Sequence, residues 1–151
     1  MPTVKSTITF RKFSDENADK CIEIFKSNTP FYFSQIDEIE FNRFIKDPAS
    51  PFFVAILRNS IVGCGGYSVM GNIGALRWGM VDFEHHKKGI GSKLLLYRLN
   101  QMINDPSIEE IRLETGMSNA RFFERYGFKI LGVDQVIEKN YRIRLQMSYT
   151  K

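Results

Sequence analysis

Hydrophobic side chains recur along this chain with two different periods, and these periods predict its helices and strands. Near the C-terminus every second residue is hydrophobic, at Tyr141, Ile143, Leu145, Met147 and Tyr149. This alternation predicts a strand with one covered face. After residue 89 the spacing becomes that of a helix, with hydrophobic positions at Leu95, Leu99, Met102 and Ile103. A helix from Gly89 to about Asn104 would bury that face.

The same patterns, together with capping and turn residues, predict the elements of the remaining chain. Ser14, followed by two acids, predicts the N-terminus of a helix. Gly65 and Gly66, inside a predicted strand, indicate a bulge or a close approach of the backbone. The predicted helices are residues 14–27, 34–47, 89–104 and a short one that Gly127 terminates. The predicted strands are residues 7–13, 52–57, 61–70, 75–81, 110–115, 128–133 and 141–149. This order predicts a single mixed α/β (α+β) sheet.

Length and composition narrow the class of protein. The chain has 151 residues, of which 43% are hydrophobic and 25% charged, and this predicts one domain, residues 1–151, with a full core. No hydrophobic run approaches the ~18 residues that span a membrane. The first residues show no hydrophobic signal region, so we expect a cytoplasmic protein. Cys21 and Cys64 form no C-x-x-C pair and have no histidines at metal spacing, so we expect core packing and no metal site.

The stretch with the clearest chemistry joins the strand that ends at Val81 to the helix that begins near Gly89. Two glycines, Gly89 and Gly91, lie in the first turn of this helix. The first amides of a helix have no partner within it and carry partial positive charge, and glycine lets an anion approach them. The stretch therefore predicts a phosphate site. It matches neither G-x-x-x-x-G-K-[ST] nor G-x-G-x-x-G, which disfavours the two common nucleotide loops.

Residues 86–91, His-Lys-Lys-Gly-Ile-Gly, resemble the acyl-CoA loop [QR]-x-x-G-x-[GA] of the GCN5-related N-acetyltransferase (GNAT) superfamily. A second segment, residues 118–128, resembles the short helix of that superfamily, which ends in aromatic-x-x-x-G-F. The order and separation of the two segments also agree with the superfamily. Two positions depart from its pattern, because His86 replaces the usual Gln or Arg and Phe83 replaces a usual proline.

The resemblance implies a GNAT-like fold, a mostly antiparallel sheet of six to seven strands with helices on both faces. It also implies transfer of an acetyl group from acetyl-CoA to a primary amine of a small molecule or peptide, by direct attack in a ternary complex. The pantetheine of the donor would pair like an added strand with the strand ending at Val81, which the superfamily splays from the strand 110–115. The residues that the resemblance assigns to acetyl-CoA are Met80, Val81, His86, Lys87, Lys88, Gly89, Ile90, Gly91, Ser92, Asn119 and Phe123.

The reaction implied by the resemblance needs a base, because an amine with a pKa of about 10.4 is mostly protonated at neutral pH. Glu114, at the end of the strand 110–115, is the first candidate, and Asp82 and Glu84 rank second. The glutamate that relatives carry in the strand before the loop is missing here. In many relatives a tyrosine at the position of Phe123 protonates the departing thiolate. Tyr126 lies at the helix end, and we expect it to pack instead.

Three consecutive aromatic residues, Phe31, Tyr32 and Phe33, connect the first two predicted helices. Connections usually carry polar residues, so a hydrophobic one is either covered or used. Packing beneath the following helix would explain these residues. In the superfamily this connection overhangs the acceptor, so the alternative is that they shape the acceptor pocket together with Tyr67.

Two other functions stay open. A catalytically silent acyl-CoA-binding module would keep the loop and lack the catalytic glutamate and tyrosine, as this chain does. A thiol-release assay with amines would separate such a module from an enzyme. A nucleic-acid-binding domain would need a basic surface. The 21 basic and 17 acidic residues give a net charge of only +4 and are interspersed, so we expect neither a nucleic-acid nor a membrane partner. A homodimer is compatible with the sequence.

Overall fold

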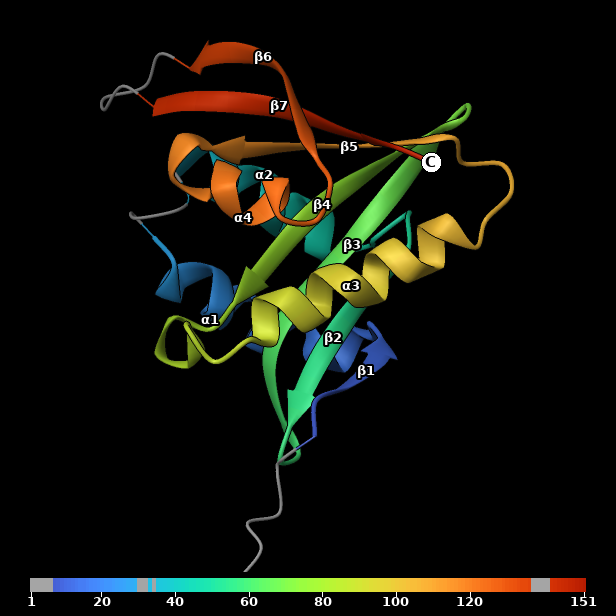
Figure 1. The fold of residues 1–151 in the computed structure, drawn as a ribbon. Coiled ribbons are helices and arrows are strands. Elements are labelled where there is room, and N and C mark those ends of the chain that lie inside the picture. Colours follow the sequence, from blue (N-terminus) through green and yellow to red (C-terminus); the bar gives the residue numbers. More distant parts are fainter. Residues whose placement is uncertain (1–6, 30–32, 34, 137–141) are drawn as a thin grey trace, which may run out of the picture. The chain divides into compact units, whose positions relative to one another are not determined.

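The computed structural model describes residues 7–29, 33, 35–136 and 142–151 (Figure 1). The helices are α1 (Ala18–Ser27), α2 (Gln35–Ile45), α3 (Ile90–Ile103) and α4 (Ala120–Glu124). The strands are β1 (Thr9–Lys12), β2 (Phe52–Leu57), β3 (Ser60–Met70), β4 (Ile73–Val81), β5 (Glu110–Gly116), β6 (Lys129–Val136) and β7 (Arg142–Thr150). Three short 3-10 turns are η1 (Asp15–Asn17), η2 (Phe83–His85) and η3 (Met117–Asn119). Phe31, Tyr32 and Tyr141 lie outside the described residues.

The predicted order of helices and strands is confirmed, with small differences at their ends. The main-chain N–H and the hydroxyl of Ser14 both donate to the side-chain oxygen of Asn17, at 3.0 and 3.1 Å. The first turn after Ser14 is the tight turn η1, so α1 begins at Ala18. Gly127 has a φ of +94°, a conformation that suits glycine, and α4 ends before it as predicted.

The strands form a seven-stranded sheet in the order β1-β2-β3-β4-β5-β7-β6. β2 pairs antiparallel with β1 and β3, and β7 pairs antiparallel with β5 and β6, whereas β4 and β5 run parallel. The prediction of a mixed, mostly antiparallel sheet is confirmed. The irregular register between β2 and β3 lies at Ala55–Ile56 and not at Gly65 or Gly66. Gly66 instead allows a close approach, since a Cβ there would overlap the main-chain oxygen of Pro51.

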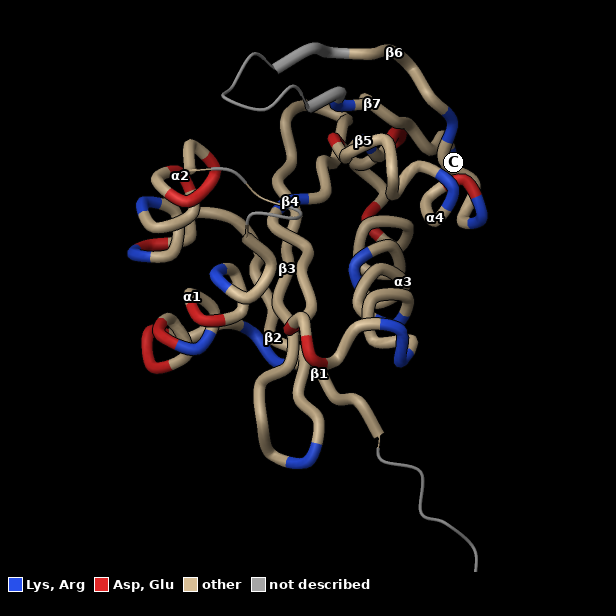
Figure 2. The backbone as a smooth tube through the Cα atoms, turned by 90° about the vertical axis from the view of Figure 1, so that its left-hand side faces the viewer, with Lys and Arg blue, Asp and Glu red and all other residues tan. Residues whose placement is uncertain are grey.

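The chain divides into two compact units. The first comprises residues 1–67 and 78–99, and the second comprises residues 68–77 and 100–151. In the first unit α1 and α2 lie on one side of β2 and β3, and α3 lies on the opposite side (Figure 2). The predicted helices on both faces are therefore confirmed. The hydrophobic core on the side of α1 and α2 contains Cys21, Ile24, Phe25, Phe41, Ile45, Phe52, Val54, Cys64 and Met80.

The second unit contains β5, β7, β6 and α4, and the three strands lie side by side (Figure 1). Leu113 of β5 lies opposite Met147 of β7, and Glu114 lies opposite Gln146. Leu113 and Met147 are buried while Glu114 and Gln146 are exposed, so one face of these strands is hydrophobic and the other polar. Within this unit β4 pairs with β5 through three residues only, 73–75 with 110–112.

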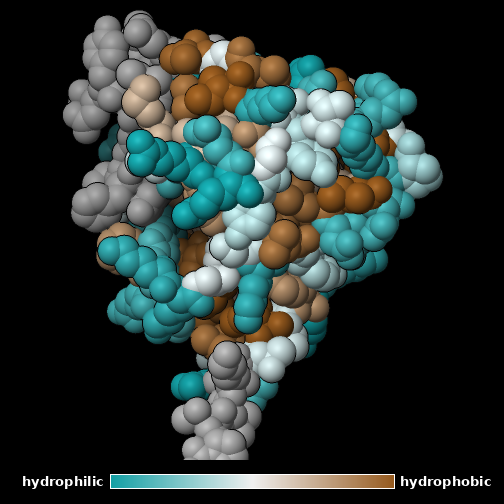
Figure 3. All heavy atoms as spheres, in the orientation of Figure 1, coloured by the Kyte–Doolittle hydropathy of each residue, from teal (hydrophilic) through white to brown (hydrophobic). Residues whose placement is uncertain are grey.

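Hydrophobic and hydrophilic side chains are interspersed on the surface that Figure 3 shows. Larger hydrophobic side chains that are exposed include Phe83 and Leu96 in the first unit, and Ile130 and Val133 in the second. Among the described residues, the longest hydrophobic helical segments fall short of what a membrane crossing requires.

Candidate active site

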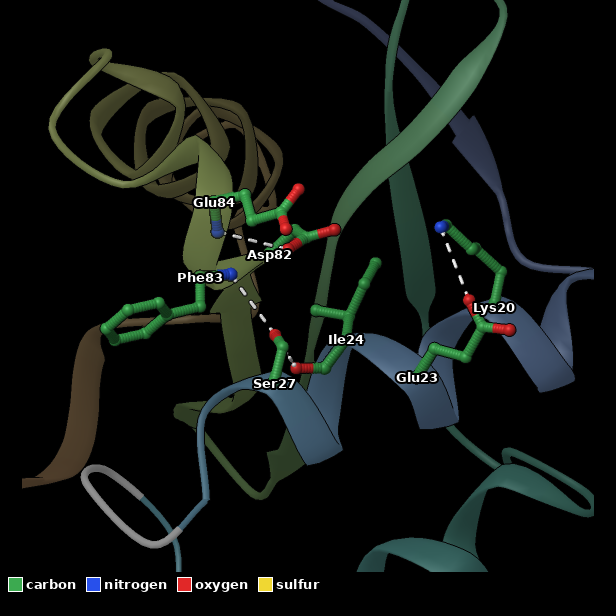
Figure 4. A network of polar contacts seen from close by, with 7 residues as sticks. All are labelled: Lys20, Glu23, Ile24, Ser27, Asp82, Phe83 and Glu84. Carbon is green, nitrogen blue, oxygen red and sulfur yellow. Dashed lines mark hydrogen bonds and ion pairs between the residues drawn. The ribbon is translucent and has the colours of Figure 1, made fainter.

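The end of α1 holds the segment that follows β4. Asn28, which is 2% exposed, donates from Nδ2 to the main-chain oxygen of Val81 at 2.9 Å and to that of Ile24 at 2.8 Å. Ser27 Oγ accepts the N–H of Phe83 at 3.1 Å and donates to the oxygen of Ile24 at 2.6 Å (Figure 4). Two adjacent polar residues therefore fix the place where the chain leaves the sheet.

The segment itself begins as the 3-10 turn η2. Asp82 Oδ1 accepts the N–H of Glu84 at 3.2 Å, which satisfies one amide at the start of this turn (Figure 4). His86 Nε2 lies 2.8 Å from the oxygen of Val81. Because a carbonyl only accepts, this ring nitrogen carries the proton. A neutral imidazole has one N–H, so His86 can donate to a phosphate as well only when its ring is protonated.

Two glycines lie at the start of α3, and the backbone conformation requires glycine at only one of them. Gly89 has a φ of +80°, which other residues rarely adopt, and its oxygen accepts the N–H of Lys93 at 3.2 Å. Gly91 is not required by the fold in this way, because a Cβ there would meet only Val81 Cγ2, at 3.9 Å. The glycine at position 91 thus keeps the first amides of α3 accessible although there is room for a side chain. Accessible amides at a helix N-terminus fit a phosphate group.

Several side chains around this helix start are basic and exposed. Lys87, Lys88 and Lys93 are exposed, and Ser92 is half-buried. Ile90, by contrast, is 3% exposed, so its side chain anchors the turn and only its main chain can meet a ligand. The three ammonium groups add positive charge to that of the helix terminus.

The last residues of β4 offer main chain rather than side chains to a ligand. The side chain of Met80 is 5% exposed and belongs to the core next to α1 and α2. The oxygen of Val81 already accepts from Asn28 and His86. Any ligand beside this strand would therefore pair with main-chain groups that precede the Val81 carbonyl.

Sequence reasoning missed Trp78, which precedes these residues. Its φ is +53°, an outlier for so bulky a side chain. The indole packs against Phe41 and Phe44, with ring centroids 5.2 and 6.1 Å away, and this packing holds the residue in its strained conformation. No local sequence pattern indicates a positive φ at a tryptophan.

Sequence reasoning also missed Arg98, which is 5% exposed on the inner side of α3. Its Nε donates to the oxygen of Leu94 and its Nη1 to that of Gly66, both at 3.3 Å. Burial lowers the pKa of Arg98 to about 10. The sequence did contain a signal, because residue 98 follows Leu94 by four positions and precedes Met102 by four, which places it on the hydrophobic face of the helix.

The second unit carries the other predicted site residues. Glu114 is exposed on the polar face of β5. Asn119 is half-buried at the end of η3, and Phe123 of α4 is half-buried with its ring centroid 6.0 Å from that of Phe128. The ring of Tyr126 packs on Phe122 at 5.4 Å, as expected.

A neighbouring carboxylate on β5, that of Glu110, is already paired with an arginine. Arg112 Nε donates to Glu110 Oε2, and this hydrogen bond lowers the pKa of Glu110 and raises the pKa of Arg112. An ionised, paired carboxylate is a poor base, so Glu114 is the stronger candidate on this strand.

The predicted acceptor residues do not come together. Phe33 is half-buried and stacks on Phe25 with ring centroids 4.6 Å apart, on the side of α1 and α2. Tyr67 is 9% exposed and packs on Phe53, which in turn contacts Tyr97 of α3. Phe31 and Tyr32 lie outside the described residues. The structure thus separates Tyr67 from Phe33, which the sequence had grouped.

The two cysteines are buried thiols, so their predicted core packing is confirmed. Burial raises the pKa of the Cys64 thiol, and a hydrogen bond with Cys21 raises it further. Over the described part of the chain, no group of three or more His, Cys, Asp or Glu side chains is arranged to hold a metal ion.

Known proteins resemble this chain in sequence and in fold. The acetyltransferase (GNAT) family matches residues 18–128. An N-alpha-acetyltransferase of Saccharolobus solfataricus is 32% identical over 140 residues, with 80% of each chain covered. The ribosomal-protein-S18-alanine N-acetyltransferase from Escherichia coli has a TM-score of 0.79 at 16% identity, covering 95% of this chain and 94% of that one. Ard1 from Thermoplasma volcanium has a TM-score of 0.76 at 22% identity, covering 95% and 97%.

The two solved structures support the fold, and the sequence matches support the activity. The matched residues 18–128 include both segments on which the resemblance rested. The family and the relative from Saccharolobus solfataricus are acetyltransferases, and neither supports the alternative of a silent binding module. The chain is therefore an acyltransferase enzyme that belongs to the acetyltransferase (GNAT) family.

Proposed function

We propose that this enzyme transfers the acetyl group of acetyl-CoA to the α-amino group of a peptide or protein. The observation that carries the proposal is the start of α3, where Gly91 keeps the first amides accessible although the fold has room for a Cβ. The 32% identical N-alpha-acetyltransferase supports the class of acceptor.

The donor would be held mainly by the first unit. Its pyrophosphate would accept hydrogen bonds from the amides of Ile90, Gly91 and Ser92, at the helix start that Gly89 shapes. Lys87 and Lys88 would add positive charge, and His86 remains a proposed contact of the donor. The pantetheine would pair with the main chain of β4 after residue 75, up to Met80 and the N–H of Val81. Asn119 and Phe123 of the second unit remain proposed donor contacts.

The reaction forms a C–N bond, breaks the C–S bond of the thioester and removes a proton from nitrogen. Glu114 is the proposed acceptor of that proton, directly or through water, because β4 carries no acid and Glu110 is paired. Asp82 is a weaker candidate, since its carboxylate already accepts the N–H of Glu84. Phe123 offers no hydroxyl to the departing thiolate, but a thiol with a pKa of about 8.5 leaves well enough for water to protonate it.

Phe31, Tyr32 and Phe33 remain the proposed surroundings of the acceptor, and Tyr67 remains a further candidate. A single domain over residues 1–151, a cytoplasmic location and a homodimer stay predictions.

A peptide pair tests the proposal directly. One peptide has a free N-terminus and one lysine, and the other has the same sequence with a blocked N-terminus. With acetyl-CoA, we expect acetylation of the first peptide at its α-amine, located by mass spectrometry, and none of the second. Acetyl-CoA at ~100 times its Kd should also stabilise the enzyme by about 2.7 kcal/mol. Absence of this stabilisation would refute the donor, and acetylation only at lysine or at an added small amine would refute the acceptor.

A further inference from the structure

Arg98 fills a space that two glycines leave between α3 and the sheet. A Cβ on Gly79 of β4 would lie 2.6 Å from Nη2 and 2.9 Å from Nη1 of Arg98. A Cβ on Gly65 of β3 would lie 3.1 Å from Cζ. The two distances at Gly79 are shorter than real side chains show, and the distance at Gly65 is tight, so the guanidinium group lies against the backbone of both strands. All three residues belong to the first unit.

The charge of Arg98 has no counter-ion in the described part of the chain. Its hydrogen bonds go to the two main-chain oxygens of Leu94 and Gly66, both at the long distance of 3.3 Å. No described carboxylate forms an ion pair with it, and no described residue accepts a hydrogen bond from Nη2. A buried cation without a counter-ion is costly, whereas a leucine or methionine would fill the same space without that cost.

The guanidinium group of Arg98 lies behind an exposed glycine of β4. Gly79, the residue against which Nη2 lies, is exposed although Arg98 behind it is buried. Gly79 immediately precedes Met80 and Val81, the residues to which the donor is assigned in the proposed function. A ligand beside this part of β4 would therefore meet a fixed positive charge through a residue that has no side chain.

We propose that Arg98 stabilises the negative charge that develops on the thioester oxygen when the acceptor amine attacks. The attack forms the C–N bond and moves the π electrons of the carbonyl group onto its oxygen. Their return breaks the C–S bond, and the thiolate leaves and takes a proton from water. Arg98 keeps its own proton throughout. A preorganised donor at such an oxygen typically contributes 10²–10³ to kcat. This inference rests on the proposed function, because it requires a thioester at β4.

Arg98→Met tests the role, because methionine fills the space and carries no charge. We expect an unchanged or higher Tm, a kcat lower by about a hundredfold and an unchanged affinity for CoA, which has no acyl carbonyl. The C=O stretch of bound 13C-labelled acetyl-CoA, measured by difference infrared spectroscopy, should move to higher frequency than in the wild type, since the carbonyl is less polarised. Arg43→Met, which removes an exposed arginine of α2, is the matched control and should leave all four quantities unchanged.

An unchanged kcat and carbonyl frequency in Arg98→Met would overturn the inference. So would an equal loss of affinity for CoA and acetyl-CoA, because that result indicates a purely structural arginine. If Arg98→Met does not fold, the same measurements on Arg98→Gln, which also removes the charge, decide the question, and a wild-type kcat and carbonyl frequency would overturn the inference. Failure of the wild type to bind acetyl-CoA would refute the proposed function itself, which is a distinguishable result.

Discussion

The side-chain amide of Asn28 donates to the main-chain oxygen of Val81 at 2.9 Å and joins the end of α1 to the point where the chain leaves β4. The same amide donates to the oxygen of Ile24, so one nitrogen serves the helix and the sheet. Asn28 itself is almost fully buried. The geometry of the proposed donor site thus depends on a residue that lies outside its sequence motif.

Asn28→Ala should therefore destabilise the fold and weaken donor binding. Removing the amide takes one donor from each of two carbonyl groups, which keep His86 and Ser27 as partners, and the loss of two hydrogen bonds costs about 1–3 kcal/mol in total. Urea unfolding measures the stability, and a titration with acetyl-CoA measures the affinity. Asn100→Ala, at an exposed position of α3, is the control and should change the stability by less than about 0.5 kcal/mol. A wild-type midpoint for Asn28→Ala would show that these bonds contribute nothing.

Gly91→Val should fold and lose its affinity for acetyl-CoA. The nearest atom to an added Cβ is 3.9 Å away, so a side chain is accommodated, but it would cover the amides proposed to bind phosphate. Loss of even one hydrogen bond to a charged group, about 1.5–3 kcal/mol, raises Kd by tenfold or more. Gly89 is a less clean position, because its φ of +80° makes any side chain strained.

The smaller change Gly91→Ala sharpens this test, because alanine favours the helix by up to about 1 kcal/mol. Stability should stay equal or rise while affinity falls. Gly132→Ala, where an added Cβ meets nothing within 4 Å, serves as the control for both measurements. Unchanged affinity in Gly91→Val would remove the start of α3 from the donor site.

Glu114→Gln should lower kcat/KM, and the loss should be largest at low pH. An amine is then mostly protonated, so removal of its proton depends most on a base. The pH profile of kcat/KM measures this, and Glu109→Gln, at an exposed position outside the proposed site, is the control. A profile identical to that of the wild type would exclude Glu114 from the mechanism.

Asp105 should make the stability of the second unit depend on pH. Its Oδ1 accepts from the hydroxyl and the N–H of Ser107, at 2.7 and 2.9 Å, and these bonds lower the pKa of Asp105. A carboxyl group whose pKa is lower in the folded state stabilises it above the unfolded pKa, about 3.9, and this stabilisation disappears as pH falls through the folded pKa. The Tm difference between the wild type and Asp105→Asn should thus be full above about pH 4 and shrink as the pH falls through the folded pKa. A constant difference across this range would contradict the assignment.

Local sequence patterns predicted those helices and strands that depend on interactions between residues close together in the sequence. The alternation at Leu145 and Met147 and the turn at Ser14 depend on neighbours within a few residues. The strand was found where expected, whereas α1 begins at Ala18 after a 3-10 turn. The sequence could not show that Tyr67 and Phe33 pack on different partners, because the face of the sheet to which a strand residue points depends on the pairing of distant segments. Trp78 was missed for a related reason, since its positive φ is held by packing against Phe41 and Phe44, which are distant in sequence.

The overlap of Arg98 with the space beside Gly65 and Gly79 has an evolutionary consequence. A Cβ at position 79 would lie 2.6 Å from Nη2 of Arg98, so a side chain at position 79 requires this arginine to move, and we expect the two positions to change together. Residues in contact often show non-additive effects, so we expect substitutions at positions 79 and 98 to be non-additive. Homologues should accordingly fall into two groups: those with both glycines and the arginine, and those with larger residues in the strands and a small one on the helix.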